Sequence, residues 1–285
     1  MTLKSKLLLL FNLLAARRFG DHDPTKWSHK DTTKWVTEFP SCGGSQQSPI
    51  DLIDTGVVQS IQEPLNFENY NETFIDDLLV ENNGHSAEIA LPETVSGARP
   101  MISGGFLTGQ YEAHSIHLHW GSLLKKGSEH TINGKRYDAE MHIVHKNVKY
   151  ADGDEASANP DGIAVLGVLL KIVDLPWKAY KNLDNVFYKL ADITKYETNT
   201  TIPQNLALNN LLGNINTKKF YAYKGSLTTP PCSEAVIWHV LAEPLKISRL
   251  ALYNLFTLKQ ENGVNLVNTY RPVQPLNGRE VYTLV

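Results

Sequence analysis

The chain has 285 residues and a formal net charge of -3, and 42% of its residues are apolar and 20% charged. This composition is typical of a globular protein with a sizeable core, and it gives no electrostatic case for nucleic acid or an anionic membrane as partner. No repeat, low-complexity tract or composition shift marks a boundary, so we expect one domain over residues 21–285.

Residues 1–20 have the pattern of a signal peptide or other leader. Two lysines precede an apolar run from Leu7 to Ala16, and two arginines follow before any acidic residue. The run is too short to span a bilayer but suits the hydrophobic core of a secretory signal peptide, which favours a secreted protein. A mitochondrial presequence and an amphipathic N-terminal helix are the alternatives. No later apolar stretch predicts a membrane span.

Strand signals dominate the middle of the chain, and helical signals are few, so the expected fold class is mainly β (α+β). The expected strands are residues 79–81, 86–91, 115–121, 139–148, 162–172 and 234–241. The nearly all-apolar run 162–172 predicts a central strand covered on both faces. Helical spacing predicts a helix over 181–191, and Ser248 is expected to cap another that runs to about Leu258.

The strongest chemical signal is a cluster of histidines in the strand 115–121. On a strand, His117 and His119 point to one face, where two imidazoles can bind zinc. A second alternating run, residues 139–145, follows an Asn-Gly turn signal, so we expect a hairpin that brings His142 beside them. Three neutral imidazoles with one open position are the ligand set of a catalytic zinc. Glu140 shares the parity of His142 and is a candidate to accept the other ring N–H of a ligand.

Each of these signals has an ordinary alternative, because a His-x-His pair in a strand is more often metal-free and a lone Glu140 would indicate a solvated charge. The surrounding blocks favour the metal. They are HLHWGS at residues 117–122, GSEHT at 127–131, AEMHIVH at 139–145 and GSLTTPP at 225–231. QSPID at 47–51, NNGH at 82–85, PDGIAVLG at 160–167 and RPVQPL at 271–276 accompany them in order.

Together, over about residues 27 to 278, these blocks resemble the alpha-class carbonic anhydrases. The resemblance implies a large twisted mixed sheet, mostly antiparallel, with short peripheral helices. It also implies that zinc held by the three histidines supports reversible hydration of carbon dioxide to bicarbonate and a proton, through attack by zinc-bound hydroxide. Sulfonamides and anions are the expected inhibitors, and esterase activity is expected to be minor.

The resemblance assigns roles around the zinc. The hydroxyl of Thr228 is expected to accept a hydrogen bond from the zinc-bound hydroxide while it donates one to buried Glu129, since an ionised carboxylate can only accept. Thr229 is expected near the bicarbonate site. His85 matches the family's proton shuttle, and Asn83 matches a residue that orders water. The residues expected to form an apolar wall for carbon dioxide are Val144, Val165, Leu227, Val236 and Trp238.

The two cysteines, Cys42 and Cys232, would by count alone be unrelated thiols. Their positions match a disulfide of secreted and cell-surface members of the family, and such a bridge would anchor the Thr228 loop. Two sequons, at Asn71 and Asn199, are candidate glycosylation sites and agree with a secretory route.

Three positions depart from the family pattern. Ser115 stands where a glutamine usually binds the first zinc histidine, His29 stands where a tyrosine lines the cavity, and Lys146 stands where an apolar residue is common. These departures bear on the rate and the inhibitor profile rather than on metal binding. By the same comparison, His130 and His145 resemble structural residues. The histidines without an assigned role are His22, His114 and His239.

Two other functions compete with this prediction. One is a binding or matrix protein that keeps the fold without the chemistry; such relatives typically lack a zinc histidine, and all three are present here. The other is a dedicated zinc esterase, which would need a wider cavity and a poor rate with carbon dioxide.

Overall fold

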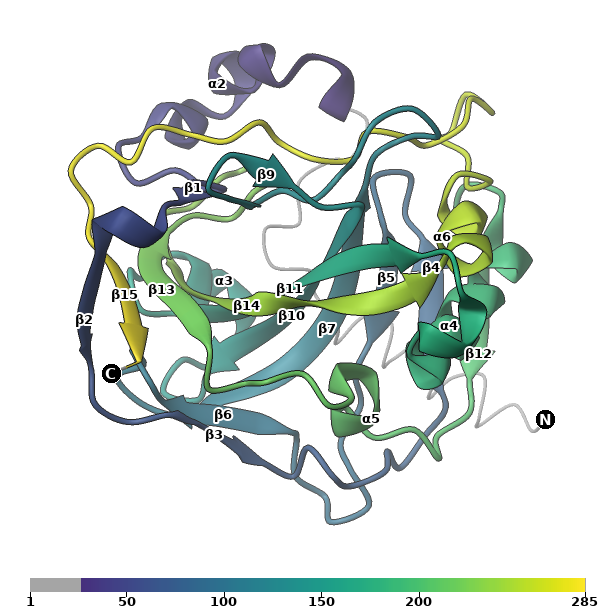
Figure 1. Ribbon diagram of the computed structural model, residues 1–285, viewed down its shortest axis with the longest axis horizontal. Coiled ribbons are helices and arrows are strands. Elements are labelled where there is room, and N and C mark those ends of the chain that lie inside the picture. Colours follow the sequence, from purple (N-terminus) through teal and green to yellow (C-terminus); the bar gives the residue numbers. More distant parts are fainter. Residues whose placement is uncertain (1–26, 285) are drawn as a thin grey trace.

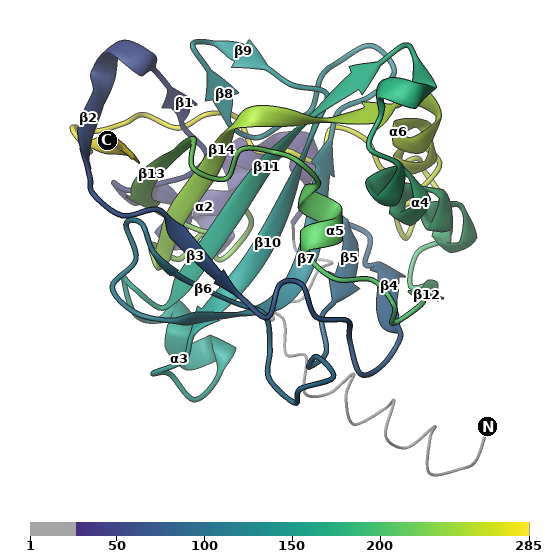
Figure 2. The same ribbon diagram turned by 60° about the horizontal axis from the view of Figure 1, so that its bottom comes forward.

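A twisted mixed sheet of 12 strands runs through the protein, with short helices outside it (Figures 1 and 2). This computed structural model describes residues 27–284, so the leader expected over residues 1–20 lies outside the described residues. The main path of the sheet is β12-β4-β5-β7-β10-β11-β14-β13-β15-β2, and β3 and β6 pair beside it. Among the described strands of this sheet, only β11 with β14 and β15 with β2 pair in parallel. The mainly β fold class is confirmed.

The strands of the large sheet are β2 (Val57–Ile61), β3 (Leu65–Glu68), β4 (Leu78–Asn82), β5 (Ala87–Ala90), β6 (Met101–Gly104), β7 (Tyr111–Trp120), β10 (Ala139–Asn147), β11 (Ile163–Val173), β12 (Asn199–Ile202), β13 (Phe220–Gly225), β14 (Val236–Ser248) and β15 (Val281–Leu284). A second sheet of three short strands contains β1 (Asp51–Leu52), β8 (Thr131–Ile132) and β9 (Lys135–Arg136).

The α-helices are α2 (Trp35–Glu38), α3 (Gly153–Ser157), α4 (Lys181–Lys189), α5 (Asn209–Leu212) and α6 (Arg249–Leu255). The 3-10 helices are η2 (His29–Lys34), η3 (Pro40–Gly43), η4 (Asp54–Gly56), η5 (Pro176–Lys178) and η6 (Leu190–Ile193). None of the helices in the described part of the chain is long and apolar enough to cross a membrane.

Several local predictions are confirmed. The first eight residues of β11 are all buried, as expected for a central strand between β10 and β14. The Ser248 hydroxyl accepts the Ala251 N–H at 3.1 Å and caps α6, although this helix ends at Leu255 rather than Leu258. The segment expected as one helix over 181–191 is α4 followed by η6.

The expected hairpin between the two histidine strands is wrong. The Asn133-Gly134 turn joins β8 to β9 instead, with φ of 50° and 73°, because an Asn-Gly pair tolerates the left-handed backbone of a tight hairpin. The strands β7 and β10 are still antiparallel neighbours, and the chain between them forms this separate hairpin.

Two hydrophobic clusters cover opposite faces of the central strands. Ile116, Leu118 and Trp120 belong to the larger cluster, which also contains buried residues of α4, α5 and α6. The smaller cluster contains Val144 and Trp238. Because side chains alternate along a strand, the histidines between Ile116 and Trp120 face away from the larger cluster.

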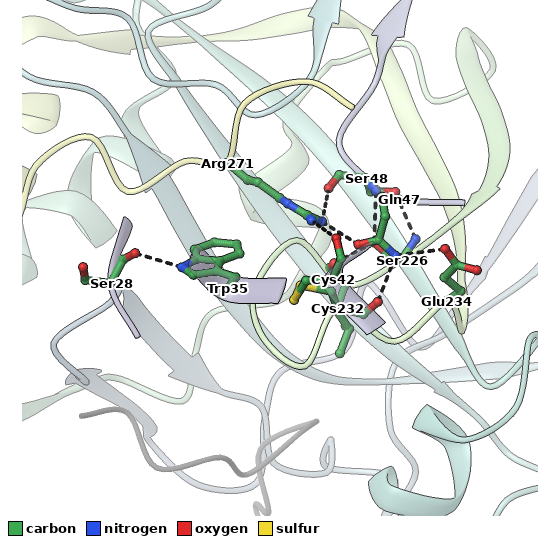
Figure 3. Close-up of a disulfide and its surroundings, with 10 residues drawn as sticks. Ser28, Trp35, Cys42, Gln47, Ser48, Ser226, Cys232, Glu234 and Arg271 are labelled. Atoms are coloured by element: carbon green, nitrogen blue, oxygen red, sulfur yellow. Dashed lines mark hydrogen bonds between the residues drawn. A yellow bond between two sulfur atoms is a disulfide. The ribbon is translucent and has the colours of Figure 1, made fainter. Parts of the chain in front are cut away.

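The predicted disulfide is confirmed: Cys42 and Cys232 are joined, with their Cα atoms 4.9 Å apart (Figure 3). The guanidinium of Arg271 donates to the Cys42 carbonyl at 2.8 Å and to the Ser48 carbonyl at 3.0 Å. The Gln47 amide donates to the Cys232 carbonyl at 3.3 Å. Three segments far apart in sequence are therefore held together, and within the loop that contains Thr228 the Cys232 N–H donates to the Thr229 carbonyl at 2.9 Å.

Candidate metal centre and active site

One cross-strand row of the sheet brings the predicted ligands together. His117 on β7 lies directly opposite His142 on β10 and, on its other side, Glu88 on β5. Directly opposed residues point to the same face, and His119 joins them two residues along β7. One ring nitrogen of each histidine forms a group whose atoms all lie within 4.8 Å of one another.

The geometry of these nitrogens fits a metal ion. Nε2 of His117 and Nδ1 of His142 are 3.2 Å apart, close to the roughly 3.3 Å separation of two nitrogens bound to one tetrahedral zinc. His119 Nδ1 is 2.6 Å from the Thr269 carbonyl, which can only accept, so Nδ1 carries the proton and Nε2 has the lone pair. This Nε2 is buried and has no hydrogen-bond partner in the described part of the chain. A bound cation would satisfy it.

Burial also keeps the three imidazoles in the state that metals bind. Desolvation lowers the pKa of His119 to about 4, lowers the pKa of His142, and holds the pKa of His117 well below its usual value. Neutral imidazoles are required for coordination, so no proton has to be removed at neutral pH.

Glu140 contacts the third candidate ligand, His142, as expected from its parity. Its Oε1 accepts from His142 Nε2 at 2.9 Å and from His130 Nδ1 at 2.7 Å. Its Oε2 accepts the backbone N–H groups of Glu129 and His130, both at 2.8 Å. Burial would raise the pKa of the Glu140 carboxyl, but His130 and these hydrogen bonds outweigh it and hold the pKa well below its usual value. The carboxylate therefore fixes Nε2–H on His142 and leaves Nδ1 free to bind.

Gly167 makes room for this arrangement. It lies opposite His142 on β11, and a Cβ at this position would be 3.2 Å from Oε1 of Glu140. Any larger residue would crowd the carboxylate that orients the ligand.

The second carboxylate, Glu129, lies next to another candidate ligand, His119. It is fully buried, and its Oε2 is 3.4 Å from Nε2 of His119. Its Oε1 accepts the Arg271 backbone N–H at 2.7 Å. Burial raises the pKa of Glu129 to about 7, against the lowering effects of nearby His142 and of the hydrogen bond from the Arg271 N–H. A dication beside it would favour the ionised form. Thr228 itself is buried, and Thr229 is half-buried.

The residues expected to form an apolar wall lie one step along from the ligand row. Val144 is opposite Val165, which is opposite Trp238, on three neighbouring strands. Val236 is buried in the same cluster, and Leu227 packs against it. On one face of the sheet, the row of His117 and His142 therefore lies between the row of His119 and Glu140 and this apolar row.

His85 lies in the turn between β4 and β5, and its ring stacks on Trp27, with centroids 3.9 Å apart and an interplanar angle of 13°. Both polar atoms of the Asn83 side chain form hydrogen bonds with the protein: Oδ1 accepts the His85 N–H at 3.0 Å, and Nδ2 donates to Glu88 at 3.1 Å. Its expected role in ordering water stays a prediction.

The three departures from the family pattern have distinct surroundings. Ser115 is opposite Val144, and its hydroxyl has no hydrogen bond within residues 27–284. His29 has a buried Nε2 without a described partner, and burial, with His119 and His85 nearby, holds its pKa well below the usual value. Lys146 is almost buried; its ammonium donates to the Tyr150 carbonyl at 2.6 Å and lies 3.3 Å from Glu112.

The remaining predicted residues lie outside the cluster of His117, His119 and His142. His130 and His145 are buried and hydrogen-bonded to Tyr223 and Tyr70, as expected for structural residues. The sequon residues Asn71 and Asn199 are both exposed. His22 lies outside the described residues.

Sequence reasoning missed four contributors. Thr269 and Arg271 act through a backbone carbonyl and a backbone N–H, which no side-chain pattern reveals. Ser86 and Glu88 contact the His85 turn and the ligand strand. The sequence pattern that could have revealed Glu88 is the two-residue alternation of β5. It puts Glu88 on the same face as His117 once β5 is paired with β7.

Comparison with known proteins agrees with this geometry. The family model for eukaryotic-type carbonic anhydrase matches residues 30–285. Carbonic anhydrase 6 of Canis lupus familiaris is 38% identical over 283 residues, covering 96% of this chain and 84% of that protein. Carbonic anhydrase 6 of Homo sapiens is 37% identical, with 96% and 88% covered. Carbonic anhydrase 7 of Mus musculus is 36% identical over 255 residues, with 87% and 92% covered. The chain therefore belongs to the eukaryotic-type carbonic anhydrase family.

Proposed function

We propose that this protein catalyses the reversible hydration of carbon dioxide to bicarbonate and a proton, with zinc held by His117, His119 and His142. The observation that carries the proposal is the convergence of three neutral imidazoles, one of which has a buried Nε2 with no described partner. When bound, zinc lowers the pKa of a coordinated water to near 7 and so supplies a hydroxide nucleophile at neutral pH.

Around that nucleophile, Thr228 and Glu129 set the direction of hydrogen bonding. An ionised Glu129 accepts from Thr228, which leaves the lone pairs of the Thr228 hydroxyl to accept from the nucleophile. Thr229 is the proposed contact for bicarbonate. The cluster that contains Val144, Val165 and Trp238 offers carbon dioxide an apolar surface beside the ligands.

Each hydration leaves one proton to be moved to solvent. We assign this step to His85, since an imidazole is the side chain that titrates near neutral pH. Inhibition by sulfonamides and small anions, and a minor esterase activity, follow from the same site.

We further propose that the protein is secreted. The support is the disulfide, which persists in oxidising compartments, and the apolar run within residues 1–20. Exposure of Asn71 and Asn199 is compatible with glycosylation at both sequons.

Stopped-flow hydration of carbon dioxide with a pH indicator tests the proposal. The assay compares protein as isolated, after chelation and after zinc is restored. Activity should vanish with the metal and return with zinc, and His142→Ala should abolish it. His145→Gln is the matched control, because His145 lies on the same strand, is buried and does not point at the ligand group. A folded, zinc-loaded protein without hydration activity would refute the proposal.

A further inference from the structure

The turn that carries His85 is held by the strand that follows it. Oδ1 of Asn83 accepts the backbone N–H groups of His85 and Ser86, at 3.0 and 2.8 Å. The amide nitrogen of the same side chain donates to Oε2 of Glu88 at 3.1 Å. A carboxylate can only accept, so Glu88 selects the amide orientation in which Oδ1 faces the turn.

The same turn is attached to the strand that carries two of the ligands. The buried Ser86 hydroxyl donates to the Leu118 carbonyl at 2.6 Å and accepts the Leu118 N–H at 3.1 Å. Leu118 lies between His117 and His119, and Glu88 lies directly opposite His117. Glu88 and Ser86 therefore connect the position of His85 to the ligand strand itself.

The tip of the turn has a tightly fitted conformation. Gly84 has φ of +83°, and a Cβ there would lie 2.8 Å from the Tyr196 ring. A turn with two asparagines and a glycine has many alternative conformations, and side-chain hydrogen bonds are what select one of them. Proton transfer requires the donor and acceptor to be held within reach, so this selection affects the rate of the step assigned to His85.

We propose that Glu88 is a positioning residue for proton transfer: it acts through Asn83 to hold His85 in a productive place relative to the metal ligands. The inference rests on the proposed function. The proton leaves after bicarbonate has formed, so a defect in positioning His85 lowers kcat in weak buffer and spares kcat/KM, which reports the conversion of carbon dioxide.

The test measures carbon dioxide hydration by zinc-loaded variants in weak buffer. Glu88→Ala should lower kcat roughly three- to tenfold and leave kcat/KM within about twofold of the wild type. Added imidazole should restore kcat, because it replaces the shuttle. Glu88→Gln keeps an oxygen that can accept from Asn83, so this conservative variant should retain most of the wild-type kcat.

A double-mutant cycle separates positioning from a general structural role. In a His85→Ala background, Glu88→Ala should have no further effect on kcat, because its route of action has been removed. An equal effect in both backgrounds, a parallel fall of kcat and kcat/KM, or equal defects in the Gln and Ala variants would overturn the proposal. If Glu88→Ala does not fold, Ser86→Ala decides through the same comparison of kcat with kcat/KM. An inactive zinc-loaded wild type refutes the proposed function, whereas an active wild type with an unaffected Glu88→Ala refutes only the role of Glu88.

Discussion

Replacing Cys42 and Cys232 together with alanine is expected to lower the free energy of unfolding by about 3 to 5 kcal/mol. The bridge joins residues separated by 190 positions, and the chain-entropy relation for a loop of that length gives about 5 kcal/mol. Residual structure in the denatured chain reduces this value. Both cysteines are buried beside Trp35 and Phe39, so loss of the two sulfur atoms adds a small packing cost.

The assay is urea unfolding at equilibrium, with zinc fixed at the same excess for both proteins because bound ligand shifts apparent stability. The m-value should rise in the alanine variant, since its unfolded chain is less compact. Reductant should destabilise the wild type by a similar amount and leave the variant unchanged. A difference below about 1 kcal/mol would refute the reasoning that the bridge stabilises this fold by restricting the unfolded chain.

Three further predictions concern protonation, metal affinity and modification. Burial lowers the pKa of His145 to about 3. Below pH 6.5 the unfolded chain therefore binds a proton that the native protein does not, and the free energy of unfolding decreases as the pH is lowered. Between pH 6 and 4, His145→Gln should lose about 1.4 kcal/mol less per pH unit than the wild type in urea unfolding; equal slopes would contradict the assignment. Glu140→Gln should weaken zinc binding roughly 10- to 100-fold in competition with a chelating dye, and an unchanged affinity would show that Glu140 does not orient His142. Asn199→Gln should reduce the mass of protein secreted from eukaryotic cells by one glycan, and an unchanged mass would exclude that site.

The clustering of the three histidines could be predicted because it depends on local periodicity. Alternation puts His117 and His119 on one face whatever the rest of the fold does, and only the partner strand of His142 had to be inferred. The inference about the connection failed, since a separate hairpin occupies the chain between β7 and β10. Pairing of strands depends on the burial of whole faces, which a turn signal alone does not specify.

The groups that complete the site were beyond sequence reasoning for a different reason. The Thr269 carbonyl and the Arg271 N–H belong to the C-terminal segment, and any residue type would supply them. The irregular register between Val144 and His145 is also a backbone feature. These two residues pair with Ser115 and Ala113, so that His114 has no opposite residue on β10. Such features come from tertiary packing, and no residue pattern marks them.

Because His117 and His142 are directly opposite each other, the histidine cluster exists only when β7 and β10 are paired in the native register. A slip of one residue between β7 and β10 would turn His142 to the opposite face from His117 and destroy the nitrogen cluster. An ion that binds all three imidazoles therefore stabilises one alignment of these strands against every other, by about 2.7 kcal/mol when its free concentration is a hundred times the Kd. Folding in the presence of zinc should consequently yield fewer misaligned chains than folding in the presence of a chelator.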